Sequence, residues 1–257
     1  MGWLSRLFRV RILRDALIPA AEFEAAVARL PILAGLAADD LSRLREQASL
    51  LLYDKQFSSA GGAEVGRTVQ LAIALQACLL TLNLDEASYH GWRELILYPD
   101  EFLRPHEEVD AAGVVHRSRD ILSGESWHGG PLVLSIADAL ASGQGSGVNV
   151  VLHEFAHKLD MLNGDANGFP PLHRGMDSAA WARDFSAAYE NLCGRVDDGK
   201  KTEIDPYATA NPAEFFAVLT EVFFEAPDIL HREYPRVYEQ MQQFYRQDPR
   251  SRLGSMA

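Results

Sequence analysis

The segment that most constrains the fold of this chain is VNVVLHEFAHKLD, residues 148–160. Its apolar residues recur at the three- and four-residue spacing of a helix with one buried face, and they are Val148, Val151, Leu152, Phe155 and Leu159. Asn163 and Gly164 then offer a helix stop. The sequence therefore predicts a helix that packs into the core of the protein.

The same segment contains the pattern HExxH. Positions i and i+4 lie on one face of a helix, so His153 and His157 can present imidazole nitrogens to one cation, with Glu154 beside them. Two histidines and a glutamate are costly to bury unless they are paired or bound to a metal. We therefore predict a zinc site in which His153 and His157 are ligands and Glu154 is the general base.

Zinc in a peptidase site needs a third protein ligand. The extended pattern HExxHxxGxxH is excluded, because Asp160 and Asn163 stand where it requires glycine and histidine. Asp160 is either an acceptor for a ligand histidine or a simple helix-end residue.

A glutamate on a later helix is the remaining source of a ligand. Asn211 and Pro212 are typical of a helix start, and the apolar segment that follows predicts a helix over 211–224. Glu214 is the best candidate ligand, although a glutamate at this position can also close a capping box. Glu221 is its rival, and the residue types do not separate the two roles.

The rest of the chain predicts an α+β fold, mostly helical, with a small mixed sheet before the HExxH helix. The expected helices are 20–30, 39–52 and 68–82, the expected strands are 95–98, 114–116 and 132–135, and 143–147 reads as a loop. We expect a helical N-terminal segment (1–60) packed on or continuous with a zincin-like catalytic domain (61–247), followed by a disordered tail (248–257).

Charge and cysteine content narrow the function classes. The net charge of −12 disfavours direct binding to nucleic acid, because an acidic protein repels phosphates. The two cysteines show no metal-binding or disulfide pattern, which fits a reduced cytoplasm.

Arginines interrupt the apolar residues of the first fourteen positions, so we expect no signal peptide there, and no stretch predicts a transmembrane segment.

Three separated segments together resemble a known family. They are GVNVVLHEFAHKLDMLNGDANGFPPL (147–172), YATANPAEFFA (207–217) and GGPLVLS (129–135). Their order and content resemble the Mlc titration factor A family of bacterial zinc peptidases, over about residues 60 to 245. The second segment also resembles the ligand helix in the catalytic domain of anthrax lethal factor.

The resemblance implies specific roles. The glutamate of AEFFA, here Glu214, is the family's third zinc ligand, and the tyrosine seven residues earlier, here Tyr207, is its oxyanion stabiliser. Glu221 then has an outer or packing role. Lethal factor has a second acidic residue four positions after its ligand, where this chain has Val218. Enterobacterial members bind the Mlc repressor of sugar uptake, so an Mlc-like repressor is an implied partner.

The predicted reaction is hydrolysis of a peptide bond in a peptide or protein substrate, with Zn²⁺ as cofactor. Leu132, Val133 and Leu134 are either core residues or an edge strand that pairs with the substrate main chain. Cleavage at a free amino terminus, as in an aminopeptidase, and cleavage at internal bonds both stay open. The alternative is a non-catalytic regulatory protein that sequesters a transcription factor and uses zinc structurally, although a structural site has no need of Glu154.

Overall fold

The structure, a computed structural model, describes residues 3–60, 62, 64–84, 86–99, 102–109, 115–122, 124–126 and 130–254. The α-helices are α1 (Trp3–Ala16), α2 (Ala20–Val27), α3 (Ala38–Asp54), α4 (Arg67–Thr81), α5 (Ile136–Ala141), α6 (Val150–Asp160), α7 (Ser178–Asp197), α8 (Pro212–Glu225), α9 (Pro227–Glu233), α10 (Pro235–Tyr245) and α11 (Pro249–Gly254). Short 3₁₀ turns are η1 (Pro31–Leu33), η2 (Glu86–Tyr89), η3 (Met161–Asn163) and η4 (Pro206–Thr209).

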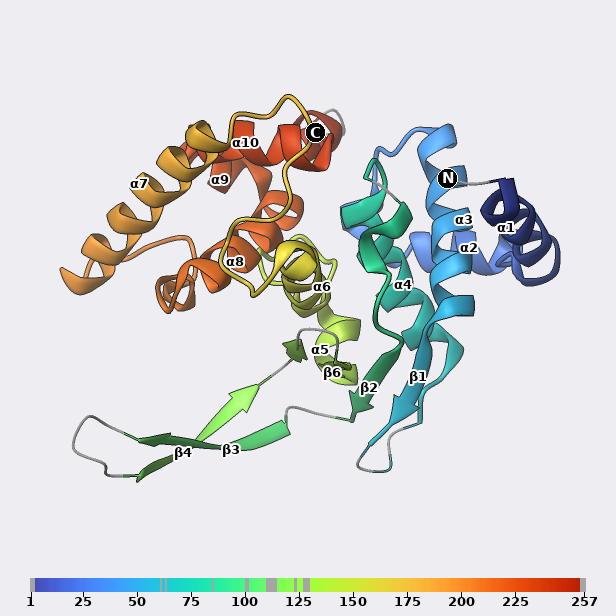
Figure 1. Ribbon diagram of the computed structural model, residues 1–257, viewed down its shortest axis with the longest axis horizontal. Helices are drawn as coiled ribbons and strands as arrows, with labels where there is room; N and C mark the ends of the chain where they lie inside the picture. The colour runs from blue at the N-terminus through green and yellow to red at the C-terminus, as the bar shows by residue number, and fades with distance from the viewer. Residues whose placement is uncertain are drawn as a thin grey trace.

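The strands are β1 (Gln56–Ser59), β2 (Glu94–Tyr98), β3 (Phe102–Val109), β4 (Val115–Leu122), β5 (Gly124–Ser126) and β6 (Leu132–Ser135). A four-stranded sheet has the order β1-β2-β6-β5, in which β1, β2 and β6 are parallel and β5 is antiparallel to β6. β3 and β4 form a separate antiparallel hairpin that extends away from the helices (Figure 1). The predicted α+β class, mostly helical with a small mixed sheet before the HExxH helix, is confirmed.

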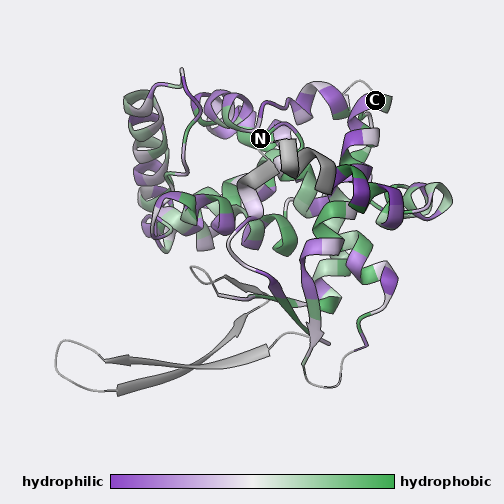
Figure 2. Ribbon diagram, turned by 45° about the vertical axis from the view of Figure 1, so that its right-hand side comes forward, coloured by the Kyte–Doolittle hydropathy of each residue, from purple (hydrophilic) through white to green (hydrophobic). Residues whose placement is uncertain are grey.

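Helix α6 lies in the middle of the molecule, with α1–α4 on one side and α7–α10 on the other (Figure 1). It packs against α4 and α8. Hydrophobic and hydrophilic residues alternate along several helices (Figure 2), whereas α4, α6 and α8 are buried over most of their length. Within the described part of the chain, no helix combines the length and apolarity needed to cross a bilayer.

The helix predictions hold with small shifts at the ends. The expected segments 20–30, 39–52 and 68–82 correspond to α2, α3 and α4, and the strands expected at 95–98 and 132–135 are β2 and β6. The third expected strand overlaps β4, although residue 114 lies outside the described residues.

Two local expectations are wrong. Val148 is 62% exposed and does not belong to the buried face of α6, because it precedes the capping residue Asn149 and so lies outside the helix. Of the tail expected to be disordered (248–257), residues 249–254 form α11, while residues 255–257 lie outside the described residues. The Arg252 guanidinium donates to the carbonyl oxygens of Ile32 and Ala34, which ties this helix to the N-terminal part of the chain.

Candidate metal centre

Helix α6 places both histidines of the HExxH pattern on one face. It starts at a defined residue, because the Asn149 Oδ1 atom accepts the Leu152 N–H and caps the helix. From that start, the His153 and His157 rings lie one turn apart with centroids separated by 4.8 Å. Their Nε2 atoms are 3.2 Å apart and face one another.

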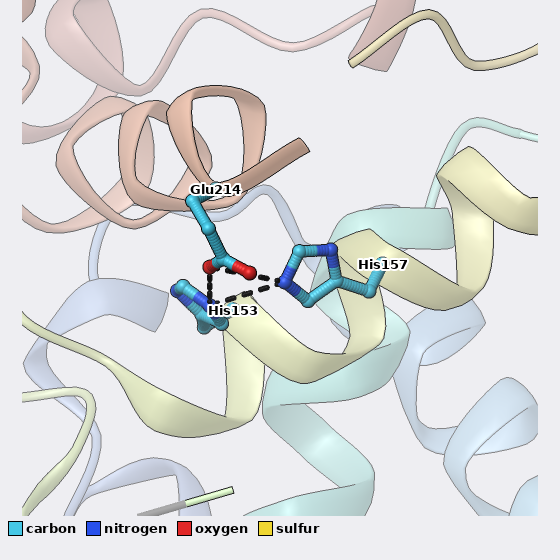
Figure 3. Close-up of side chains that lie close together, drawn as sticks. All are labelled: His153, His157 and Glu214. Carbon is cyan, nitrogen blue, oxygen red and sulfur yellow. Dashed lines mark hydrogen bonds and ion pairs between the residues drawn. The ribbon is translucent and has the colours of Figure 1, made fainter. Parts of the chain in front are cut away.

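Helix α8 brings a carboxylate to the same point. Asn211 caps α8 by accepting the N–H groups of Ala213 and Glu214, and Pro212 occupies the first turn, as the sequence predicts. Because the Asn211 side chain caps the helix, the Glu214 carboxylate is available for other contacts. Its Oε2 atom lies 3.0 Å from the His153 Nε2 atom and 3.4 Å from the His157 Nε2 atom (Figure 3).

These three atoms fit the ligand set of a zinc ion. Ligand atoms held at about 2.0–2.1 Å from a tetrahedral metal lie roughly 3.3 Å from one another, and the observed separations are 3.0, 3.2 and 3.4 Å. Among the described residues, His153, His157 and Glu214 form a group that could hold a metal ion. The buried His157 Nδ1 atom has no hydrogen-bond partner in the described structure. The orientation of the His157 ring therefore depends on the contacts of its Nε2 atom.

The His153 ring is oriented by a second carboxylate on α8. Its Nδ1 atom lies 2.7 Å from the Glu221 Oε1 atom, and the other Glu221 oxygen accepts the Asn149 N–H. A hydrogen on Nδ1 directed at Glu221 leaves the Nε2 lone pair available to a cation. Glu221 therefore lies behind the histidine rather than beside Glu214, in agreement with the outer role that the family resemblance implies.

The same contacts set the charge state of the cluster without metal. Burial lowers the pKa of His153, but its hydrogen bonds to Glu214 and Glu221 outweigh this and hold the pKa well above its ordinary value. Burial raises the pKa of Glu214, but the two histidines outweigh it and hold that pKa well below its usual range. Both shifts favour the charged forms of His153 and Glu214, which lie 3.0 Å apart and are half-buried.

A cavity of about 510 Å³ opens beside the three-residue cluster. Its lining includes His153, Glu154, Tyr207 and Glu221. Glu154 is 4% exposed, while Tyr207 on η4 is 52% exposed, with its ring centroid 6.2 Å from that of His153. The structure therefore brings both residues with predicted catalytic roles to the same cavity.

The substrate strand predicted at Leu132–Leu134 is not an edge. Strand β6 pairs with β2 on one side, and on the other side each of these three residues pairs with a residue of β5. Their side chains are buried and do not line the cavity. The expectation of an edge strand is wrong, because the three-residue strand β5 covers β6.

The cavity is also lined by residues for which the sequence indicates no functional role. The loop before α6 contributes Ser142, Ser146, Gly147 and Val148. Its glycines mark it as a loop in the sequence, but nothing in the residue types indicates that it faces the HExxH helix. Asp160, considered above as an acceptor for a histidine, instead accepts the N–H groups of Asn167 and Gly168 with its Oδ2 atom.

The chain is similar in sequence to one peptidase family and to several curated proteins. The sequence model of a family described as glucose-regulated metallo-peptidase M90 matches residues 4–246. The curated relative "Mlc titration factor A" of Salmonella agona (strain SL483) is 40% identical over 229 residues, which cover 87% of this chain and 85% of the relative. The proteins of the same name from Enterobacter sp. (strain 638) and Yersinia pestis (strain Pestoides F) are 39% and 40% identical, covering 95% and 87% of this chain and 91% and 84% of the relatives.

Proposed function

This chain belongs to the glucose-regulated metallo-peptidase M90 family, and we propose that it is a zinc-dependent peptidase whose metal ligands are His153, His157 and Glu214. The observation that carries the proposal is the convergence of three buried or half-buried ligand atoms at 3.0 to 3.4 Å from one another. That spacing suits a tetrahedral zinc site with one position left for water or substrate.

In this proposal Glu154 is the general base. It follows the first ligand directly and lines the cavity where a peptide would bind. A bound zinc ion would supply Lewis acidity, which polarises the scissile carbonyl and makes water more acidic. The Glu154 carboxylate accepts the proton of the attacking water and passes it to the leaving amine.

Tyr207 stabilises the negative charge that develops on the carbonyl oxygen. It stands at the wall of the same cavity, beside the His153 ring. The Asp205 carboxylate accepts the Tyr207 N–H and so fixes the η4 turn that carries the phenol. A phenol hydroxyl that donates one hydrogen bond to the developing oxyanion lowers the barrier without touching the metal.

The cavity favours a substrate that carries positive charge. Four of its described lining residues are acidic, namely Asp138, Glu154, Asp205 and Glu221, and none is lysine or arginine. A free amino terminus would meet this requirement, and so would a lysine or arginine side chain, so the charge of the cavity is compatible with both cleavage modes.

The test combines one variant with one set of substrates. Glu154→Gln should keep stoichiometric zinc and lose nearly all hydrolysis, because an amide cannot accept the proton. Peptides with free and with acetylated amino termini, incubated with zinc-loaded protein with and without chelator, decide the cleavage mode. Hydrolysis that persists in the Gln variant, or that no chelator inhibits, would refute the mechanism.

A regulatory role through a repressor of sugar-uptake genes is a second candidate. The relatives are called titration factors for Mlc, and a family description as glucose-regulated points the same way. Such a partner is a DNA-binding protein, so this role places the chain in the cytoplasm. Binding of an Mlc-type repressor by Glu154→Gln, measured with purified proteins, would separate the regulatory role from hydrolysis, whereas loss of both together would tie them to one site.

A further inference from the structure

The loop between α5 and α6 is built around one buried carboxylate. Glu225, the last residue of α8, is 4% exposed and accepts N–H groups from Gly143, Gly145 and Ser146. Its Oε1 atom also accepts the Asn149 side-chain N–H at 2.6 Å. Each oxygen therefore receives two donors, and one side chain satisfies four polar hydrogens of the segment that leads into α6.

The backbone of this loop is shaped for that contact. Gly143 and Gly145 have φ angles of 86° and 78°, a region that favours glycine and that turns successive N–H groups toward a common centre. A side chain at 143 would also collide with Leu30 and Gln76. The loop thus surrounds a carboxylate as other glycine-rich loops surround a bound anion.

Helix stability does not account for the position of Glu225. A negative charge in the last turn of a helix opposes the helix dipole, and burial of a carboxylate adds a desolvation cost. The four donors from the loop offset these costs. The charge at 225 therefore serves the loop rather than α8.

The loop is part of the candidate active site. Ser142, Ser146, Gly147 and Val148 line the cavity next to His153. The network also continues from the Asn149 side chain to its backbone N–H, which donates to Glu221, the residue that orients His153. Glu225 and the metal ligands are thus linked, but Glu225 itself contacts the loop and not the imidazoles.

We propose that Glu225 is a positioning residue that holds the 142–148 loop in place as one wall of the substrate cleft, and so sets the affinity for the peptide and not for the metal. The proposal rests on the peptidase function proposed above. It divides the carboxylates of α8 into separate roles, in which Glu214 binds metal, Glu221 orients His153 and Glu225 shapes the cleft.

Glu225→Gln is the direct test. The glutamine has one oxygen, so whichever site its NH₂ group occupies leaves two of the four donors facing a donor, either the Gly143 N–H and the Asn149 side chain or the N–H groups of Gly145 and Ser146. Hydrogen exchange of the Gly143 amide, or of the Gly145 and Ser146 amides, should therefore accelerate at least tenfold, while the amides of α6 and α8 keep their protection. Zinc content should stay at one per chain, KM for peptides should rise about tenfold, and kcat should change less than twofold.

The matched control is Glu190→Gln, the same change at an exposed glutamate of α7, which should move none of these quantities. If Glu225→Gln fails to fold, Gly145→Ala takes its place. That variant keeps the carboxylate, its added Cβ atom meets only an ordinary contact at 3.8 Å, and it strains the loop alone through its positive φ. It should give the same rise in KM with zinc retained.

Unchanged exchange of the loop amides in Glu225→Gln, or an unchanged KM in either folded variant, would overturn the proposal. Loss of zinc in parallel with activity would overturn it as well. A wild-type protein that hydrolyses no peptide would instead refute the proposed function. In that case the role of the loop is tested by binding instead of hydrolysis, with the affinity of zinc-loaded protein for fluorescein-labelled casein measured by anisotropy. Equal affinities of wild type and Glu225→Gln would reject the role of the loop.

Discussion

Glu221→Gln removes one acceptor from a carboxylate that serves two donors. The Glu221 oxygens accept the His153 Nδ1–H and the Asn149 N–H, and the residue is 6% exposed. If the amide oxygen of the glutamine faces His153, the Asn149 N–H is left against an NH₂ group. If it faces Asn149, the imidazole meets a donor at Nδ1 and must carry its own hydrogen on Nε2, where the metal would bind.

Both arrangements have a cost that can be sized. A buried donor without an acceptor costs about 1–3 kcal/mol, so the metal-free protein should lose roughly that much stability. A histidine that loses its orienting carboxylate typically binds metal about 10- to 100-fold more weakly, which is roughly 1.4–2.7 kcal/mol of zinc affinity. We expect both losses in either arrangement, because one donor is always left without an acceptor and the neutral amide no longer raises the basicity of the His153 ring.

Competition against a chromophoric chelator measures the zinc Kd, and urea unfolding in excess chelator measures the stability without metal. The matched control is Glu225→Gln, the same change one turn further along α8 at a residue with no contact to His153. Its zinc Kd should stay within about twofold of wild type. A zinc Kd for Glu221→Gln equal to that of wild type, or an equal loss in both variants, would refute the assigned role of Glu221.

Three further predictions concern the cluster and its cavity. Tyr207→Phe should lower kcat on the order of a hundredfold, with zinc content and Tm nearly unchanged, and a kcat equal to wild type would reject the oxyanion role. Glu214→Gln should purify without stoichiometric zinc by elemental analysis, and full zinc occupancy would show that the third ligand is misassigned. The contribution of Glu214 and His153 to the stability of the metal-free protein should be greatest between about pH 4.5 and 6.5, the ordinary pKa values of the two groups. The lowered pKa of Glu214 makes its contribution disappear as pH falls through that pKa, and the raised pKa of His153 makes its contribution disappear as pH rises through that pKa. Urea midpoints of chelated protein that stay flat from pH 6.5 to 9 would contradict the His153 part.

Local sequence signals predicted those parts of the site that one helix determines. The spacing of His153 and His157 fixes their geometry as soon as α6 forms, and Asn211 with Pro212 fixes the start of α8. Local sequence signals do not decide which of Glu214 and Glu221 lies beside the two histidines. The two glutamates are seven residues apart and lie on nearly the same face, about 10 Å apart along the axis. Only the way α8 packs across α6 decides which of them lies beside both histidines.

The wrong predictions for strand β6 and for the tail have one origin, which is contact between separate segments of the chain. The three residues of β5 are too few to show a period, so β6 looked like an edge strand although it has a neighbour on each side. The position of residues 248–257 at the chain end predicts a disordered tail, yet Arg252 donates to carbonyl oxygens more than two hundred residues earlier in the chain. Contacts between distant segments leave no local pattern to read.

The placement of three carboxylates on one helix has a consequence for the whole site. Glu214, Glu221 and Glu225 fall within about 40° of one another around the axis of α8, because spacings of seven and four residues nearly complete whole turns. The opposite side of α8 is held by aromatic packing, with the Phe216 ring 6.1 Å from that of Trp181. A rotation of α8 would therefore displace the proposed metal ligand, the partner of His153 and the anchor of the 142–148 loop together. The aromatic packing under this helix thus sets the position of Glu214 relative to the cavity, although Phe216 and Trp181 do not line that cavity.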